Sequence, residues 1–130
     1  MSNPRVSVVI PVRNGKEYLQ EALDSVLQQS FSDLELLLIN DGSTDDDYGR
    51  YALQDTRIRV LHLGGTGVSR ARNVGMAQSR GDLIAFLDAD DTWFPGKLQM
   101  QVQYFDNHPD VGVVFGKFIR WPALPEGGFA

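Results

Sequence analysis

The chain has 130 residues and a formal net charge of -5, with an isoelectric point near 4.8. This length suits one domain with a sizeable core, so we expect residues 1–130 to form a single domain. The negative charge and scattered basic residues disfavour a nucleic acid partner, and the absence of cysteine excludes disulfides and thiolate metal sites.

The opening of the chain carries no segment that we expect to cross a membrane. The apolar run in MSNPRVSVVIPV is too short for a signal peptide or a membrane span. We therefore expect a soluble, cytoplasmic protein. Residues 121–130, WPALPEGGFA, are rich in Pro and Gly and are typical of a tail, either frayed or cut from a longer chain.

Five short apolar runs rich in β-branched residues predict strands. Their starts lie 24–28 residues apart, which leaves room for a helix and two loops and far exceeds the length of a hairpin turn. The rhythm predicts successive βαβ units, and the near-continuous apolar character predicts strands buried on both faces. The runs are VSVVIPV from Val6, LELLLIN from Leu34, IRVLHL from Ile58, LIAFLD from Leu83 and VGVVFGKFI from Val111.

Helix signals fill the intervals between these runs. Asn14 followed by Glu17 resembles a capping box at the start of a first helix. Residues 43–54 favour a short second helix, and residues 69–79 a third that Gly81 would cap. Pro95 suits the first turn of a fourth helix over residues 96–107. The pattern predicts an α/β fold, a Rossmann-like three-layer α/β/α sandwich with a mainly parallel sheet.

Acidic residues follow the fourth predicted strand, at the edge where parallel sheets collect ligands. Asp88 and Asp90, separated by one residue, can hold a hard divalent cation whose remaining ligands are waters and phosphate oxygens. Capping of the next helix, or simple solvation, is the alternative. Crowding of like charges at a strand end that we expect to be mostly buried favours the cation, which would relieve the repulsion.

Two further strand ends carry candidate residues. Asp41, before Gly42, could accept the imide hydrogen of a uracil ring, although a D-G-S sequence also occurs in ordinary turns. The glycines of LHLGGTGVSRARNVG match neither a dinucleotide fingerprint nor a Walker loop. Arg72, near the start of a helix, suits phosphate oxygens, whereas Arg70 is typical of a solvated surface.

These segments together resemble the nucleotide-sugar half of the family 2 glycosyltransferases, inverting enzymes of the GT-A fold. Each motif is short, but their order and spacing are specific and cover about nine-tenths of the chain. The matching segments are VSVVIPVRNGKEYLQEALDSVLQQSF, LELLLINDGSTDDD, GVSRARNVGMAQSRGDLIAFLDADDTWFPGKLQMQ and VGVVFG.

The resemblance implies a nucleotide-sugar donor, UDP-sugar first, with Mg²⁺ or Mn²⁺ bridging its diphosphate. Asp88 and Asp90 match the metal-binding DxD motif, with Asp91 as a supporter. The acceptor would be a saccharide or a lipid-linked molecule, in the second case at the inner face of the membrane. The implied nucleotide-sugar residues are Pro11 and Val12 at the base and ribose, Asp41 at the base, Arg72 near the base or diphosphate, and Asp88 and Asp90.

Three questions stay open from the sequence. In the family, the carboxylate that takes the acceptor's proton lies beyond this region, so the chain is either part of a longer protein or a short relative. LIAFLDADDT also fits a HAD-type phosphatase with Asp88 as nucleophile. A non-catalytic nucleotide-binding or assembly module, including a homo-oligomer, is the third interpretation.

Overall fold

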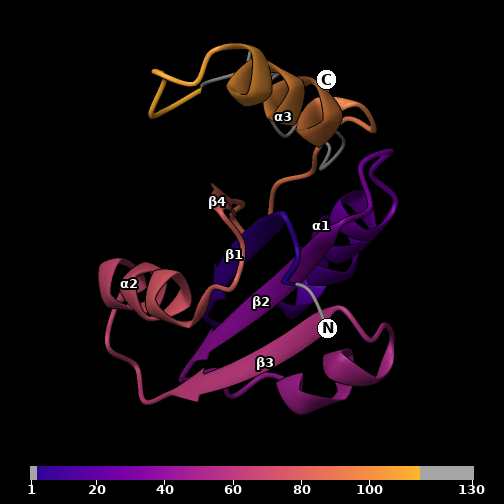
Figure 1. Ribbon diagram of the computed structural model, residues 1–130. Helices are drawn as coiled ribbons and strands as arrows, with labels where there is room; N and C mark the ends of the chain where they lie inside the picture. The colour runs from indigo at the N-terminus through magenta and orange to yellow at the C-terminus, as the bar shows by residue number, and fades with distance from the viewer. Residues whose placement is uncertain (1–2, 115–130) are drawn as a thin grey trace, which may run out of the picture. The chain divides into compact units, whose positions relative to one another are not determined.

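The computed structural model describes residues 3–114, and within them four parallel strands form one sheet (Figure 1). The sheet order is β3-β2-β1-β4, with β1 at Val6–Val12, β2 at Leu34–Asp41, β3 at Ile58–Leu63 and β4 at Leu83–Phe86. The helices are α1 (Lys16–Leu27), the 3-10 helix η1 (Tyr48–Leu53), α2 (Val68–Gln78) and α3 (Lys97–Asn107). The predicted α/β fold with a parallel sheet is confirmed.

Strands β1 and β2 form the centre of the sheet and are buried at every position. On one face Val9, Leu37 and Ile39 form a core cluster with Ala71 of α2. Helix α2 lies so close to the sheet there that a Cβ on Gly75 would stand 2.4 Å from a methyl carbon of Val9. Helix α1 lies on the other side of the sheet (Figure 1) and buries one apolar stripe: Leu19, Ala22, Leu23 and Val26.

Strand β4 departs from the prediction of burial on both faces. It pairs with β1, and Ile84 and Phe86 remain 41% and 44% exposed. In the register Phe86 lies opposite Val9, on the face that α2 covers over the two central strands. Helix α2 does not cover β4, so this apolar strand is partly exposed at the edge of the sheet that residues 3–114 form.

Two predicted helix ends are wrong in detail. The N-cap of α1 is Gly15, and no side-chain hydrogen bond caps it; Asn14 instead accepts a hydrogen bond from the Thr44 amide. Helix α2 ends at Gln78 with Ser79 as C-cap, so Gly81 is not the cap. The reason for glycine at 81 is a close approach, because a Cβ there would stand 2.8 Å from the Ser7 nitrogen. The predicted second helix is shorter, since only residues 48–53 are helical.

The chain divides into two compact units, residues 1–99 and 100–130. The first holds the whole sheet, α1, η1 and α2, and the second begins within α3. Residues 111–114 of the fifth predicted strand form no strand, and the rest of that run and the tail at 121–130 lie outside the described residues. The single domain therefore stays a prediction. None of the helices in residues 3–114 is long and apolar enough to cross a membrane.

Candidate functional site

The acidic loop, residues 88–94, follows β4 and is fixed at both ends. Before it, the Leu87 amide donates to the Val9 carbonyl at 3.1 Å and extends the pairing with β1. After it, the side chain of Gln29 donates to the Phe94 carbonyl at 2.7 Å and accepts from the Leu98 amide at 3.0 Å. Gln29 is buried, so these bonds hold the far end of the loop against the end of α1. Hydrogen bonds therefore hold both ends of the acidic loop in place.

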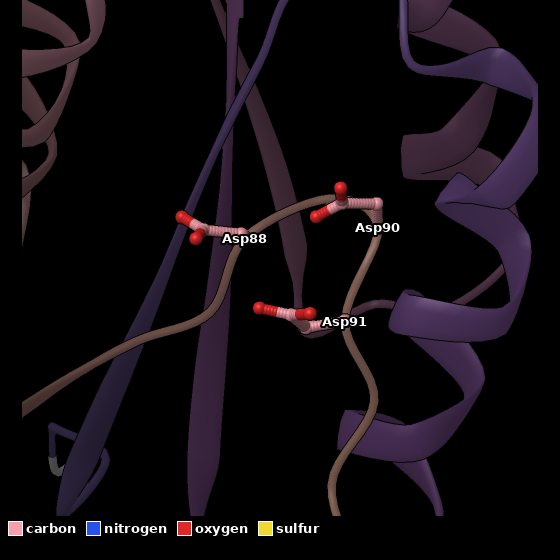
Figure 2. A group of neighbouring side chains, drawn as sticks. All are labelled: Asp88, Asp90 and Asp91. Carbon is pink, nitrogen blue, oxygen red and sulfur yellow. The ribbon is translucent and has the colours of Figure 1, made fainter. Parts of the chain in front are cut away.

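Three carboxylates meet in this loop. One oxygen each of Asp88, Asp90 and Asp91 lies within 4.8 Å of the others (Figure 2). All three side chains are exposed, so the expectation of a mostly buried strand end is wrong. Partial desolvation, followed by the charges of Asp90 and Asp88, raises the pKa of Asp91. Helix α3 begins only at Lys97, so these acids do not cap it. Their proximity is an arrangement that suits a hard cation.

Arg72 of α2 reaches the acidic loop. Its Nη2 atom donates to Oδ1 of Asp88 at 3.1 Å, and both side chains are partly exposed. Among residues 3–114 this is the one ion pair that the three carboxylates make. The structure thus brings together two residues, Arg72 and Asp88, that lie 16 positions apart and that the sequence assigned separately to the donor.

Asp41, at the end of β2, is buried and holds the loop that leads into α2. Its Oδ1 atom accepts from the amides of Gly65 and Thr66 at 3.0 and 2.7 Å, and from the Thr66 hydroxyl. Its Oδ2 atom accepts from the Gly67 amide at 2.7 Å. The Thr66 amide leads the effects that lower the pKa of Asp41, although burial opposes them. The carboxylate is therefore ionised, and it holds the glycine-rich loop, the segment with Gly65, Thr66 and Gly67, in place.

Two hollows flank the end of β1, and Pro11, Val12 and Arg13 line both. The first, of about 280 Å³, extends to Tyr18 and Asp90. The second, of about 290 Å³, is completed by Asp41, Gly67, Val68 and Ala71. Three of the predicted residues, Pro11, Val12 and Asp41, thus line one concave surface, and Asp90 lines its neighbour.

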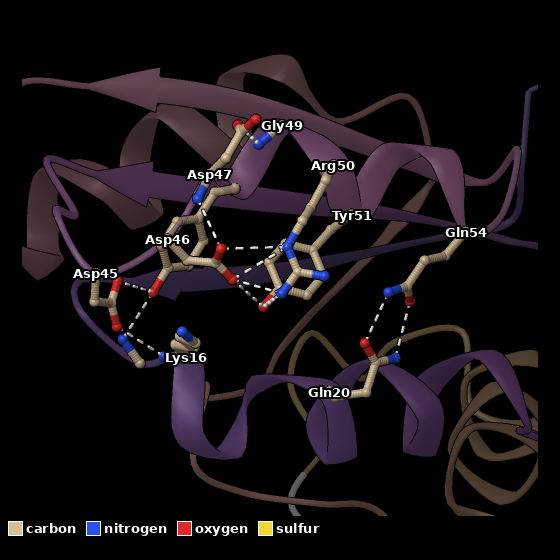
Figure 3. A network of polar contacts seen from close by, with 11 residues as sticks. Lys16, Gln20, Asp45, Asp46, Asp47, Gly49, Arg50, Tyr51 and Gln54 are labelled. Atoms are coloured by element: carbon tan, nitrogen blue, oxygen red, sulfur yellow. Dashed lines mark hydrogen bonds and ion pairs between the residues drawn. The ribbon is translucent and has the colours of Figure 1, made fainter.

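A polar network joins the segment that follows β2 to the start of α1 (Figure 3). Asp45 accepts from the Lys16 amide and from the Tyr48 hydroxyl, which in turn accepts from the Gly15 amide. Burial, followed by the hydrogen bond to Asp45, raises the pKa of Tyr48 to about 12. The hydrogen bond from Arg50 lowers the pKa of Asp46 to about 2. Asp45 and Asp46 therefore have structural roles. The run of three Asp residues in the sequence does not reveal these roles.

Two residues near the site escaped the sequence prediction. Arg13 borders both hollows and makes no hydrogen bond or ion pair with the described residues. Its place after the first predicted strand, next to Val12, was the available signal. Gln29 had no such signal, because its two partners lie 65 and 69 residues away along the chain.

Comparison with known proteins identifies the family. The family model described as glycosyl transferase family 2 matches residues 7–121. The chain is 45% identical to glycosyltransferase EpsJ of Bacillus subtilis over 68% of this chain and 26% of that protein. It is 32% identical to glycosyltransferase GlyG of Streptococcus pneumoniae, over 89% of this chain and 40% of that protein. The chain thus spans less than half the length of these relatives.

Solved structures agree on the fold. S. aureus TarS in complex with UDP-GlcNAc gives a TM-score of 0.72 at 24% identity, covering 93% of this chain and 38% of that one. Mannosyltransferase PcManGT from Pyrobaculum calidifontis, in complex with GDP-Man and Mn²⁺, gives 0.70 at 24% identity, covering 81% and 33%. Because the family model matches residues 7–121, the chain belongs to glycosyl transferase family 2.

Proposed function

We propose that this chain is the donor-binding part of an inverting glycosyltransferase and that it binds a UDP-sugar together with Mg²⁺ or Mn²⁺. The observation that carries the proposal is the meeting of Asp88, Asp90 and Asp91 within 4.8 Å of one another, with Asp90 lining a hollow at the end of β1. Family membership supports it, as do the nucleotide-sugar ligands named for TarS and PcManGT.

The carboxylates fit a small divalent cation. Two oxygens bound to one Mg²⁺ at about 2.1 Å lie at most about 4.2 Å apart. Adjacent ligands of an octahedral Mg²⁺ lie about 3 Å apart, and the three acids offer oxygens within 4.8 Å of one another, so side-chain rotations that move these oxygens by up to about 2 Å would suffice. Their exposure leaves room for waters and phosphate oxygens. Asp88 and Asp90 would hold the ion with support from Asp91, and the ion would neutralise charge that develops on the diphosphate as the sugar departs.

The nucleoside would occupy the second hollow. Pro11 and Val12 offer apolar contacts to the base and ribose, and Asp41 lines the same space. Although Asp41 holds the glycine-rich loop, its Oδ2 atom accepts, within residues 3–114, only the hydrogen bond from the Gly67 amide. A carboxylate oxygen can accept two hydrogen bonds, so this atom keeps the capacity to accept the imide hydrogen of uracil.

Sugar transfer would be an activity of the longer protein. We propose a saccharide or lipid-linked acceptor and a cytoplasmic location, at the inner face of the membrane if the acceptor is a lipid. The residue that takes the acceptor's proton is unassigned. Family membership argues against the phosphatase interpretation of Asp88.

Calorimetric titration tests the proposal. UDP and GDP are titrated into the chain with Mn²⁺ and with EDTA, and the titrations are repeated with Asp90→Asn. We expect UDP to bind only with Mn²⁺ and more tightly than GDP. Asp90→Asn should weaken binding at least about tenfold, because even the outer-shell partners of metal ligands contribute about 10–100-fold.

Asp82→Asn is the matched control, because Asp82 is an exposed acid at the opposite end of β4. This variant should bind UDP as the unmodified chain does. UDP binding that persists in EDTA, or that Asp90→Asn leaves unchanged, would contradict the proposed metal site.

A further inference from the structure

The three carboxylates of the acidic loop carry more negative charge than Arg72, their one ion-pair partner among residues 3–114, can offset. Asp88, Asp90 and Asp91 contribute three formal negative charges within a few ångströms, and Arg72 contributes one positive charge. Among the three acids, Arg72 donates a hydrogen bond only to Asp88. In Figure 2 the carboxylate of Asp88 points away from Asp90, whereas the carboxylate of Asp90 points back toward Asp88.

The ion pair between Arg72 and Asp88 is of a kind that exchanges readily. The side chains are 39% and 53% exposed, and the contact consists of a single hydrogen bond of 3.1 Å. Exposed pairs of this type contribute little to folding, because water solvates the separated charges almost as well. A divalent cation that takes Asp88 as a ligand therefore meets only a small opposing free energy from Arg72.

The released guanidinium would stay next to the nucleotide. Arg72 follows Ala71, which lines the same hollow as Asp41 and Pro11. It also lies in the first turns of α2, where the helix N-terminus adds partial positive charge. A guanidinium in this place is a suitable donor to diphosphate oxygens.

We propose that Arg72 is a placeholder cation. It forms an ion pair with Asp88 in the free chain, is displaced from Asp88 by the divalent ion, and then binds the diphosphate. The inference rests on the proposed donor site and adds an order to its assembly. Metal and Arg72 compete for Asp88, whereas Arg72 and the nucleotide attract each other. Removal of Arg72 therefore changes the two affinities in opposite directions.

The test measures Mn²⁺ and UDP binding separately in Arg72→Gln. Free Mn²⁺ is followed by electron paramagnetic resonance without nucleotide, and UDP is titrated by calorimetry at saturating Mn²⁺. We expect Mn²⁺ alone to bind about twofold to fivefold more tightly, the range that corresponds to an exposed ion pair. UDP should bind at least about tenfold more weakly, because a charge-assisted hydrogen bond is lost.

Two further variants separate this role from a structural one. Arg72→Lys keeps the charge and should return Mn²⁺ affinity to within about twofold of the unmodified chain. Arg70→Gln removes an exposed arginine that makes no ion pair with the acidic loop and should change neither affinity. Weaker or unchanged Mn²⁺ binding in Arg72→Gln would overturn the placeholder role. Absence of Mn²⁺-dependent UDP binding in the unmodified chain would instead overturn the proposed function and, with it, this inference.

Discussion

Asp41 holds the glycine-rich loop through both of its carboxylate oxygens. Three consecutive amides, those of Gly65, Thr66 and Gly67, donate to it, and the side chain is buried. Gly65 and Gly67 have φ values of 86° and 98°, which residues with a Cβ rarely adopt. The loop is therefore shaped by one carboxylate and two glycines, and Asp41 has a structural role alongside the proposed contact with the base.

We expect Asp41→Asn to lower the free energy of unfolding by about 2–3 kcal/mol. The amide would replace an acceptor by a donor that faces other N–H groups, and buried hydrogen bonds to charged groups are worth about 1.5–3 kcal/mol. Urea unfolding followed by circular dichroism measures the change. Asp33→Asn is the control, because Asp33 is exposed and its side chain makes no hydrogen bond with residues 3–114. Equal stabilities of the two variants would contradict the structural role of Asp41.

Helix α2 and strand β1 approach each other through the missing side chain of Gly75. A Cβ at this position would stand 2.4 and 3.1 Å from the two methyl carbons of Val9, a residue with no exposed surface. Glycine normally weakens a helix interior by about 1 kcal/mol relative to alanine. Its presence here is a packing requirement that keeps α2, and so Arg72, close to the sheet.

Gly75→Ala should therefore destabilise the protein by about 1–3 kcal/mol despite the better helix propensity of alanine, because overpacking a close contact costs that much. Urea unfolding midpoints give the measurement. Gly64→Ala is the matched control, because apart from its two chain neighbours no described residue has a heavy atom within 4 Å of a Cβ built there. A stabilised Gly75→Ala protein would show that α2 can move away from β1 without loss.

The sequence predicted the elements well where local pattern decides them. Strands β1 and β2 are mostly apolar and are buried throughout, as predicted. The pattern failed at β4, because an apolar run does not say whether a neighbouring element covers it. The capping prediction at Asn14 failed because that side chain binds the Thr44 amide, 30 residues along the chain. Of the site, the proximity of the acids was predictable from D-A-D-D, but the pairing of Arg72 with Asp88 was not, since it depends on where α2 lies.

Across the molecule, the negative charges of buried and paired acids couple stability to pH. Burial opposes the ionisation of Glu35, but hydrogen bonds from the Ser7 hydroxyl, the Arg80 amide and Arg59 outweigh it and lower the pKa of Glu35. The pKa of Asp41 is also lowered, chiefly by the Thr66 amide. Glu35 and Asp41 lie near opposite ends of the same strand, β2, so an ionised carboxylate stabilises each end of this strand.

We expect the free energy of unfolding to decrease as the pH falls below about 4.5, the ordinary pKa of Glu35. A folded-state pKa below the unfolded one gives stability that is present above the unfolded value and is lost on acidification. The loss should extend toward pH 2, where Asp46 titrates with a pKa of about 2. Asp91, whose pKa is raised, opposes the trend in part. Urea midpoints between pH 6 and pH 2.5 provide the measurement.

Glu35→Gln should be less stable at pH 6 and should lose less stability on acidification, since it removes one of the titrating groups. A midpoint that is the same at pH 3 as at pH 6 in the unmodified chain would contradict the coupling.

The loop around Asp41 resembles an anion cradle that is filled from within. Its three converging amides are the kind that hold phosphate in other nucleotide-binding proteins, yet the anion here is the side chain of Asp41, which lies 24–26 residues away along the chain. No oxyanion from solution can take its place while that side chain is ionised. Recognition of the diphosphate of the proposed donor would then depend on side chains and a cation. Evolution can retune such recognition by single substitutions without remaking a loop.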